Sequence, residues 1–401
     1  MEKNNRLKNF IACLIICLIS GYGYAWSVFQ LPIVEQYGLE EMGVALCFTL
    51  TILFSTFTPL IFGKLIKKMS MQKICIVGGI LLGLGIFSSG IVRSTEMLYL
   101  TYGVAAGIGV GFIYPSLMSY SVKLYPNKKG LSSGLMAASY GSGAVLWSPV
   151  ISKLLSMYHV SSVFKILGIG FFIIILISSF FVGDIRDDSV KNSVIDNHAK
   201  QYTRKEMMKT SLFYIMVITF TLGLTSGLMV IGQASPILQN TLNFSKELAA
   251  TFVGVFSLCN TFGRLIFGSM SDKIGIMKTV RIIFLTALIS MGIIYAVDVN
   301  IIVIVCMGLA AMSYGGFASI ITPITGDIFG QKHITENYGA MYVVFGLAGL
   351  IGPRLAIYFK TINNGSYSNA FLFTSLLSFV GIVLTFIIEL ILRKNSKEIN
   401  A

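Results

Sequence analysis

The feature that most limits the fold of this sequence is a series of twelve long apolar stretches separated by short polar segments. Each is close to the roughly 20 residues that a helix needs to cross a bilayer. Lipid offers no partner for backbone N–H and C=O groups, so runs of this length must form helices. The expected spans are 10–36, 41–63, 73–93, 96–122, 131–156, 161–183, 211–238, 246–270, 278–297, 299–325, 336–359 and 367–392. The sequence therefore predicts an all-α membrane protein with twelve transmembrane helices.

Composition supports this interpretation and excludes a soluble domain. Hydrophobic residues make up 55% of the chain and charged residues 12%, whereas soluble domains carry about 25% charged residues. The net charge of +13 lies in short runs between the apolar segments. Basic residues placed in this way set membrane orientation, so we expect contact with the lipid bilayer and no nucleic-acid partner.

The distribution of Lys and Arg predicts the orientation. If the N-terminus is cytoplasmic, most of the 30 basic residues fall in the termini and loops of the cytoplasmic side. The opposite side then holds only Arg93, Lys153, Lys165, Lys246, Arg354 and Lys360. This asymmetry places both termini in the cytoplasm. We expect a multi-pass protein of the plasma membrane, specifically a bacterial inner membrane.

The longest polar stretch, residues 184–210, divides the chain into two halves. We expect a six-helix bundle over 1–183, a cytoplasmic linker with a short surface helix over 184–210, and a second bundle over 211–401. Features recur in the same order in both halves: Gly23 and Pro32 match Gly227 and Pro236, and Gly134 and Gly141 match Gly339 and Gly346. Such repeats are typical of transporters, so the two bundles are expected to be pseudo-symmetric.

Arg264 is the most informative single residue. It lies eight residues before Asp272, which marks the cytoplasmic edge of its span. At 1.5 Å per residue this is a depth of about 12 Å, near the middle of a core roughly 30 Å thick. Arginine stays protonated and matches a carboxylate with two hydrogen bonds. We interpret it as a substrate-binding residue; the alternative is that it bonds backbone carbonyls or extends towards the cytoplasm.

The other ionisable residues predict little chemistry at membrane depth. All acidic and histidine side chains fall in loops, tails or span ends, so no proton relay is expected near the midplane. The six cysteines lie in apolar stretches without metal-ligand spacing. We therefore expect no metal site, no cofactor and no enzymatic activity. Transport would be coupled through the charge of the substrate itself.

Aromatic and amide side chains in the spans are candidates for orienting a small carboxylate in an otherwise apolar cavity. Tyr24, Tyr140 and Tyr342 are the preferred candidates. Further candidates are Trp26, Gln30, Tyr114, Gln233, Tyr314, Phe345 and Asn260. The alternative for each is ordinary helix packing or a place in an interfacial aromatic belt.

The loop after the eighth span, Gly268-Ser-Met-Ser-Asp272-Lys273-Ile-Gly275, resembles the signature loop of the major facilitator superfamily. The equivalent loop after the second span departs from it, with Lys67 where Asp is usual and Ser70 where Gly is usual. The resemblance implies the major facilitator fold and a gating role for Gly268, Asp272, Lys273 and Gly275. A topology signal from Lys273 alone is the alternative.

Three further patches resemble the oxalate:formate antiporter and monocarboxylate transporter families. They are Tyr24-Ala-Trp26-Ser-Val-Phe29, Asn260-Thr-Phe-Gly-Arg264, and Asp327-Ile-Phe-Gly330 with Asn337-Tyr338-Gly339. This resemblance implies that Arg264 binds the substrate carboxylate. Phe345 stands where the oxalate antiporter has a lysine, which favours a monoanion. Asn260 stands where monocarboxylate transporters often have an Asp, which argues against simple proton symport.

The sequence therefore predicts a secondary transporter, an antiporter or facilitator, that moves a small organic anion by alternating access. The favoured substrate is a monocarboxylate. Other hypotheses are an exporter of apolar or cationic compounds, which gives Arg264 no role, a sensor with a transporter fold, and an intramembrane enzyme. The expected partners are a small anionic solute and lipid, and the chain is expected to be a monomer.

Overall fold

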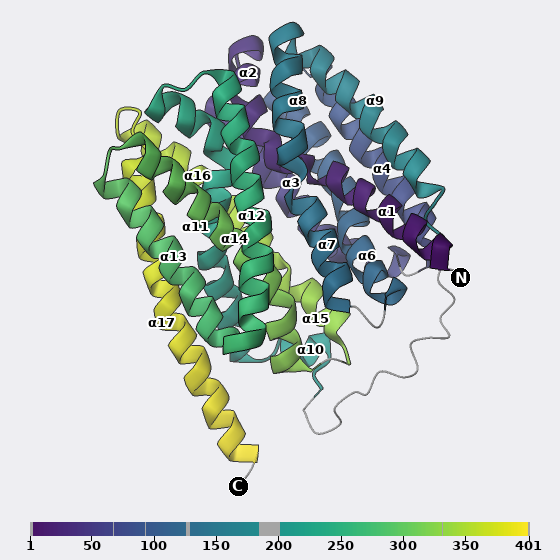
Figure 1. Cartoon of the computed structure of the whole chain (residues 1–401), viewed down its shortest axis with the longest axis vertical. Coiled ribbons are helices and arrows are strands. Elements are labelled where there is room, and N and C mark those ends of the chain that lie inside the picture. The colour runs from purple at the N-terminus through teal and green to yellow at the C-terminus, as the bar shows by residue number, and fades with distance from the viewer. Residues whose placement is uncertain are drawn as a thin grey trace. The chain divides into compact units, whose positions relative to one another are not determined.

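The computed structural model describes residues 3–66, 68–92, 94–125, 129–183, 201–330 and 332–399. Within these ranges the regular elements are all helical (Figure 1). The helices of the first six spans are α1 (Lys3–Ser20), η1 (Gly21–Ala25), α2 (Trp26–Tyr37), α3 (Glu41–Ile66), α4 (Met71–Ser89), α5 (Thr95–Leu98), η2 (Tyr99–Ala106), α6 (Gly107–Leu124), α7 (Lys129–Gly141), α8 (Gly143–Met157) and α9 (Val160–Ser179).

The second half follows the same pattern. Its helices are α10 (Arg204–Met207), α11 (Ser211–Leu242), α12 (Lys246–Ile274), α13 (Ile276–Ala296), α14 (Asn300–Phe329), α15 (Ile334–Met341), α16 (Val343–Ile362) and α17 (Ser368–Ile399). The short helix expected in the polar stretch is α10. Residues 184–200 of the predicted linker lie outside the described residues.

Eleven of the helical segments described are long and apolar enough to cross a membrane. The remaining expected span is the fifth, residues 131–156, which is divided into α7 and α8 at Ser142, so neither piece has that length alone. The all-α fold predicted from hydropathy is thus confirmed. The predicted spans begin and end close to the observed helices because apolar length decides where a chain can cross lipid.

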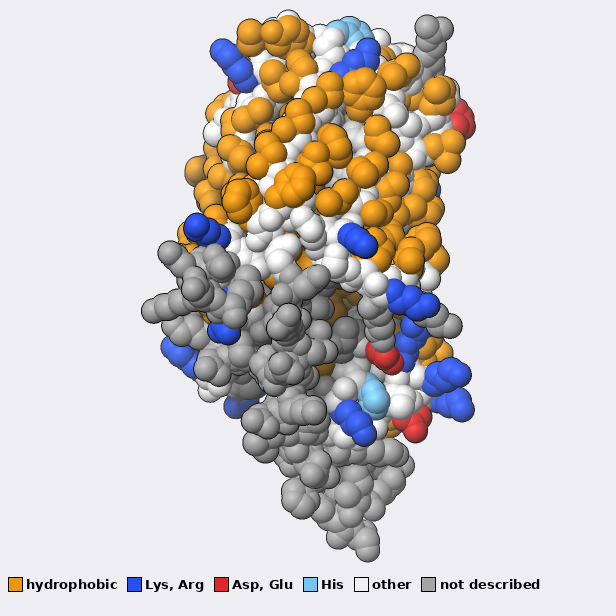
Figure 2. Space-filling view, turned by 90° about the vertical axis from the view of Figure 1, so that its right-hand side faces the viewer, with side chains coloured by type: hydrophobic (Ala, Val, Ile, Leu, Met, Phe, Trp, Pro, Cys, Tyr) orange, Lys and Arg blue, Asp and Glu red, His pale blue; other side chains and the backbone are white. Residues whose placement is uncertain are grey.

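The outer surface carries the apolar side chains that such a fold must present to lipid. On the face shown in Figure 2, hydrophobic side chains gather in the upper part and Lys and Arg are concentrated towards the lower part. Helix α9, for example, exposes Ile166, Ile169, Ile173 and Ile177. A surface with this many large exposed apolar side chains is stabilised by contact with lipid and not with water.

The chain forms two compact units. Unit 1 comprises residues 1–194 and 231–261, and unit 2 comprises residues 195–230 and 262–401. Unit 1 therefore includes the end of α11 and the first half of α12, which the sequence assigns to the second half. Side chains of these segments contact α2 and the end of α7, as described below. The division into repeats at 183 and 211 stays a prediction about the two halves.

Candidate functional site

Two interrupted helices meet inside unit 1. The first span changes from α1 to the 3-10 turn η1 before continuing as α2, and the fifth changes from α7 to α8 at Ser142. The backbones touch at these breaks: a Cβ on Gly21 would lie 2.1 Å from the carbonyl oxygen of Tyr140, and one on Gly143 would lie 2.4 Å from the carbonyl carbon of Gly21. Only glycine permits this approach. Interrupted helices of this kind are typical of transporter binding sites.

The breaks bring three of the predicted tyrosines together. The rings of Tyr24 on η1 and Tyr140 on α7 pack edge to face with centroids 5.4 Å apart. Tyr114 on α6 stacks on Tyr140 at 4.1 Å. Tyr24 and Tyr114 are buried and Tyr140 is half-buried. These three candidates thus lie together within unit 1, and their binding of substrate stays a prediction.

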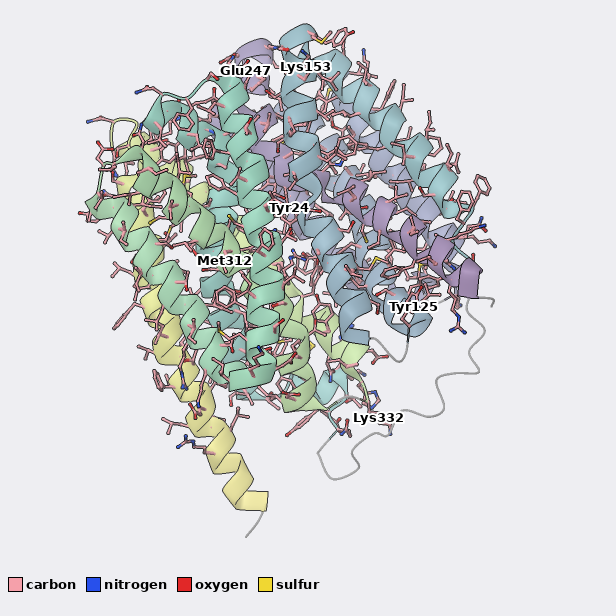
Figure 3. All side chains as sticks on the ribbon, viewed as in Figure 1. Tyr24, Tyr125, Lys153, Glu247, Met312 and Lys332 are labelled. Carbon is pink, nitrogen blue, oxygen red and sulfur yellow. The ribbon has the colours of Figure 1, made fainter. Side chains whose placement is uncertain are left out.

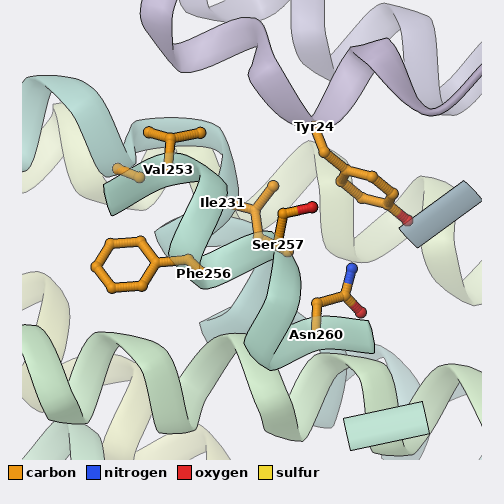
Figure 4. A pocket seen from close by; sticks show the side chains of 7 residues that line it. Tyr24, Ile231, Val253, Phe256, Ser257 and Asn260 are labelled. Atoms are coloured by element: carbon orange, nitrogen blue, oxygen red, sulfur yellow. The ribbon is translucent and has the colours of Figure 1, made fainter. Parts of the chain in front are cut away.

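A small cavity of about 10 Å³ lies beside Tyr24 (Figure 4). It is lined by Tyr24, Ile231, Ala234, Val253, Phe256, Ser257 and Asn260. Its polar groups are a phenol, a hydroxyl and an amide, and the rest of its wall is apolar. This volume suits about one water molecule, so the cavity must widen before a carboxylate could enter it.

Ser257 was not among the residues that the sequence singled out. Its hydroxyl donates a hydrogen bond of 2.5 Å to the carbonyl oxygen of Gly141, at the break between α7 and α8. The sequence does contain a signal for Ser257: it lies three residues before Asn260, and residues at that spacing share a helix face. A search for polar residues one turn from Asn260 would have found it.

Gln30 on α2 and Gln233 on α11 form a reciprocal amide pair. Each Nε2 donates to the Oε1 of the other, at 3.0 and 2.9 Å. Both side chains are completely buried. Both were predicted to bind substrate, and here each amide satisfies the other. Their binding of a solute stays a prediction, and it requires this pair to separate.

A further polar contact joins α2 to the start of α12. Lys246 donates to Glu35 at 2.7 Å, and both side chains are more than half exposed, so the ion pair adds little stability. Nearby is a second cavity of about 70 Å³. It is lined by Val28, Pro32, Gln36, Ser152, Leu155, Ser156, Ser235, Gln239, Lys246 and Glu247. The buried amides therefore provide the stronger of the two polar links.

We expect Gln30→Ala to lower the free energy of unfolding by about 1–3 kcal/mol, because it leaves the buried amide of Gln233 without its partner. Gln233→Ala should cost a similar amount. The Gln30→Ala/Gln233→Ala double variant should cost less than the sum of the two. Thermal unfolding of the purified variants in detergent measures this cycle, and strictly additive losses would contradict coupling of the two amides.

Trp26 lies apart from both cavities, and its binding of substrate stays a prediction. It is fully buried, and its ring lies 4.4 Å from that of Tyr102. The packing alternative describes its contacts in this structure, because a large aromatic side chain gains most from full burial.

Arg264, in the second half of α12, is 7% exposed. Of the side chains that the structure describes, it is the only charged one in the buried class. The preceding residue explains how α12 reaches this position: a Cβ on Gly263 would lie 2.0 Å from the carbonyl oxygen of Met312 on α14, so the two helices pack backbone to backbone (Figure 3).

Three aromatic candidates of unit 2 lie together. Tyr342 is the residue between α15 and α16, and its ring centroid is 4.8 Å from that of Phe345. Phe345 also packs edge to face against Tyr314 of α14 at 6.2 Å. Tyr314 and Phe345 are buried, whereas Tyr342 is half-buried. These three candidates thus lie together within unit 2, and their binding of substrate stays a prediction.

The expected gating residues lie at the end of α12. Gly268 is within the helix, Asp272 and Lys273 are exposed in its last turn, and Gly275 joins it to α13 with φ of 89°. Positive φ explains the glycine. Among the side chains that the structure describes, Asp272 has no ion-pair partner, so its gating partner stays a prediction. Among the described residues no group of three or more His, Cys, Asp or Glu is arranged to hold a metal.

Comparisons with known proteins agree on the class of protein. The sequence matches the profile of the Major Facilitator Superfamily over residues 11–353 and 215–401. It is 28% identical to the uncharacterized MFS-type transporter YhjX of Escherichia coli, covering 87% of each chain. It is 27% identical to the oxalate:formate antiporter of Oxalobacter formigenes, covering 94% of this chain and 90% of that one.

Two further transporters are similar to this chain at lower sequence identity. The chain is 23% identical to monocarboxylate transporter 12 of Xenopus laevis, over 76% of this chain and 71% of that one. A crystal structure of a bacterial homologue of the human lysosomal transporter Spinster, inward-facing and unoccupied, has a TM-score of 0.78. That match covers 97% of this chain and 98% of the other at 14% identity, so it concerns the fold alone.

Proposed function

Since the chain belongs to the Major Facilitator Superfamily and is thus a multi-pass membrane transporter, we propose that it carries a small monocarboxylate by alternating access. The observation that carries this proposal is the burial of Arg264 as the single buried charge among the described side chains. A charge at membrane depth costs about 2.5–3.5 kcal/mol on insertion scales, and such residues generally serve function.

The chemistry of the guanidinium favours a carboxylate as its ligand. It is planar, stays protonated and offers paired N–H donors in the geometry of a carboxylate. Two of the relatives are by name an oxalate:formate antiporter and a monocarboxylate transporter. Both kinds of solute carry carboxylates, which supports the same substrate class for this chain.

A monoanion is favoured over a dianion by the charge of the site. Arg264 supplies one positive charge, and the other substrate-binding candidates of unit 2 are the aromatic residues Tyr314, Tyr342 and Phe345. A second carboxylate would need a second buried cation, because burying an unpaired charge is costly. We infer that formate, lactate or pyruvate fits better than oxalate.

Coupling to protons is not part of the proposal. No Asp, Glu or His is in the buried class among the side chains described, whereas proton relays in transporters use such residues at membrane depth. We infer a facilitator or exchanger whose coupling comes from the charge of the substrate. Acidification of proteoliposomes in strict proportion to uptake would contradict this.

The test of the substrate class is a thermal-shift panel with purified protein. Formate, lactate, pyruvate and oxalate are added separately, because a ligand of the folded state raises its stability by about 2.7 kcal/mol at a hundred times its dissociation constant. We expect one of the monoanions to raise the unfolding temperature and oxalate to raise it less. No shift with any of the four would overturn the proposal.

We also propose that Asp272 serves conformational exchange and not binding. Asp272→Asn should slow the initial rate of formate exchange in proteoliposomes severalfold while leaving the formate-induced thermal shift close to that of the wild type. The reason is that an exposed carboxylate at a helix end can pair with a cation or a helix N-terminus in one conformational state and release it in the other. Equal losses of binding and transport would argue against a gating role.

We place both termini in the cytoplasm of a bacterial cell, with the protein in the inner membrane as a monomer. The asymmetry of Lys and Arg supports the orientation. Labelling of single introduced cysteines from either side of the membrane tests it.

A further inference from the structure

The segment that precedes α11 is tied to the turn between α14 and α15. Residues 201–207, here called the strap, belong to unit 2 with both of those helices. The backbone N–H of Tyr202 donates to the carbonyl oxygen of Phe329 at 2.9 Å. The backbone N–H of Lys332 donates to Oε1 of Gln201 at 3.0 Å. Two hydrogen bonds in opposite directions thus join the strap to this turn, which carries Lys332 (Figure 3).

A side chain of α15 completes the attachment. Nδ2 of Asn337 donates to the carbonyl oxygen of Tyr202 at 3.0 Å, and Asn337 is completely buried. A buried amide used in this way contributes more than a surface contact, because loss of one partner leaves a buried polar group unsatisfied. The strap is therefore bonded to both ends of the turn and to the helix that follows it.

Apolar contacts and a helix cap make the strap rigid. The ring of Tyr202 packs edge to face against Phe329 at 5.7 Å, and Met207 is fully buried. Thr203 and Glu206 form a capping box at the start of α10. The side chain of each residue accepts a hydrogen bond from the backbone N–H of the other. Figure 1 shows α10 beside α15. The strap is thus a built part of unit 2.

Gly330 has two reasons to be glycine. Its φ is 90°, a conformation that other residues adopt with strain. A Cβ there would lie 2.3 Å from Oε1 of Gln201, the atom that accepts from Lys332. Gly330 and Asn337 both belong to the third patch of the family resemblance, and neither is a candidate for binding substrate. Their contacts give this patch a role in holding the strap.

We propose that the strap fixes α15, and through it Tyr342, with Asn337 as the positioning residue. Tyr342 directly follows α15 and packs against Phe345. Movement of α15 therefore moves this aromatic pair. The importance of Tyr342 for substrate rests on the proposed function, whereas the hold of the strap on α15 stands on the contacts alone.

The test is hydrogen exchange of the full-length protein in detergent without added solute. Asn337→Ala should speed exchange in peptides covering both 201–207 and 334–342 by roughly fivefold to a hundredfold, because the lost partner costs about 1–3 kcal/mol. Gln201→Ala, which removes only the acceptor for Lys332, should give a smaller change in the same peptides and serves if Asn337→Ala does not fold.

A pair of glycine variants provides the matched control. Gly330→Ala should loosen both segments, whereas Gly365→Ala should leave both at the wild-type rate. Gly365 has the same strained conformation, with φ of 93°, but open space around the position of a Cβ. Faster exchange in 201–207 with no change in 334–342 would overturn the proposal, as would equal effects of the two glycine variants.

A second measurement separates the strap from the substrate. If the wild type binds formate, Asn337→Ala should weaken the formate-induced thermal shift, and an undiminished shift would overturn the link to Tyr342. Absence of any formate shift in the wild type counts against the proposed function, since the exchange experiment contains no solute.

Discussion

Arg264→Gln is expected to abolish the thermal shift given by formate and to reduce formate uptake into proteoliposomes by at least roughly thirtyfold, because losing the charged partner of a buried carboxylate costs about 2–5 kcal/mol. The variant keeps hydrogen-bond donors but loses the charge that attracts the anion. It also removes the only buried charge among the described side chains. The unfolding temperature without added solute is measured as well, so that loss of formate binding is distinguished from loss of the fold.

Two further variants make this prediction specific. Arg354 is exposed on α16, so Arg354→Gln removes the same charge without touching a buried site and should leave the formate shift unchanged. Arg264→Lys keeps the charge but not the paired N–H donors, so it should recover part of the binding. A folded Arg264→Gln protein that binds formate as well as the wild type would reduce Arg264 to a structural residue and favour export of apolar or cationic compounds.

Gly143→Val is expected to cause the largest loss of stability, above the roughly 1–3 kcal/mol typical of overpacking. The nearest atoms to the new Cβ are backbone atoms of Gly21, which cannot move aside as a flexible side chain would. The two interrupted helices would have to separate, and Tyr24 and Tyr140 would separate with them. The unfolding temperature in detergent should fall sharply, and fluorescence-detected size exclusion should show less monodisperse protein.

The matched control lies in the same span. A Cβ on Gly134 of α7 meets no atom within 4 Å, so Gly134→Val should leave the unfolding temperature close to that of the wild type. Similar losses from both variants would mean that valine is simply unfavourable in this span. The contact between Gly21 and Gly143 would then have no special importance.

Most of the fold follows from the sequence because the solvent of this protein is lipid. Lipid requires every backbone polar group to be satisfied within its own segment, so an apolar run of sufficient length is a helix wherever it packs. The predicted span 211–238 and helix α11, residues 211–242, illustrate how local this rule is. Arg264 was likewise found from local information, since its depth follows from its distance to Asp272 along one helix.

Tertiary structure decided what hydropathy could not. The interruption at η1 and the break at Ser142 lie within continuous apolar runs, and they exist because two backbones touch at Gly21 and Gly143. Residues 231–261 belong to unit 1, and within that unit Gln233 pairs with Gln30, 203 residues away in the chain.

The same distinction applies to the candidate site and the strap. Arg264, Tyr24 and Tyr342 stand out by residue type, and a sequence shows residue type directly. The contacts of Ser257 with Gly141 and of Asn337 with Tyr202 join distant segments. Membrane depth is a property of each segment alone, so the sequence determined it. Which helices touch is a property of all the segments packed together, so only the tertiary structure decided it.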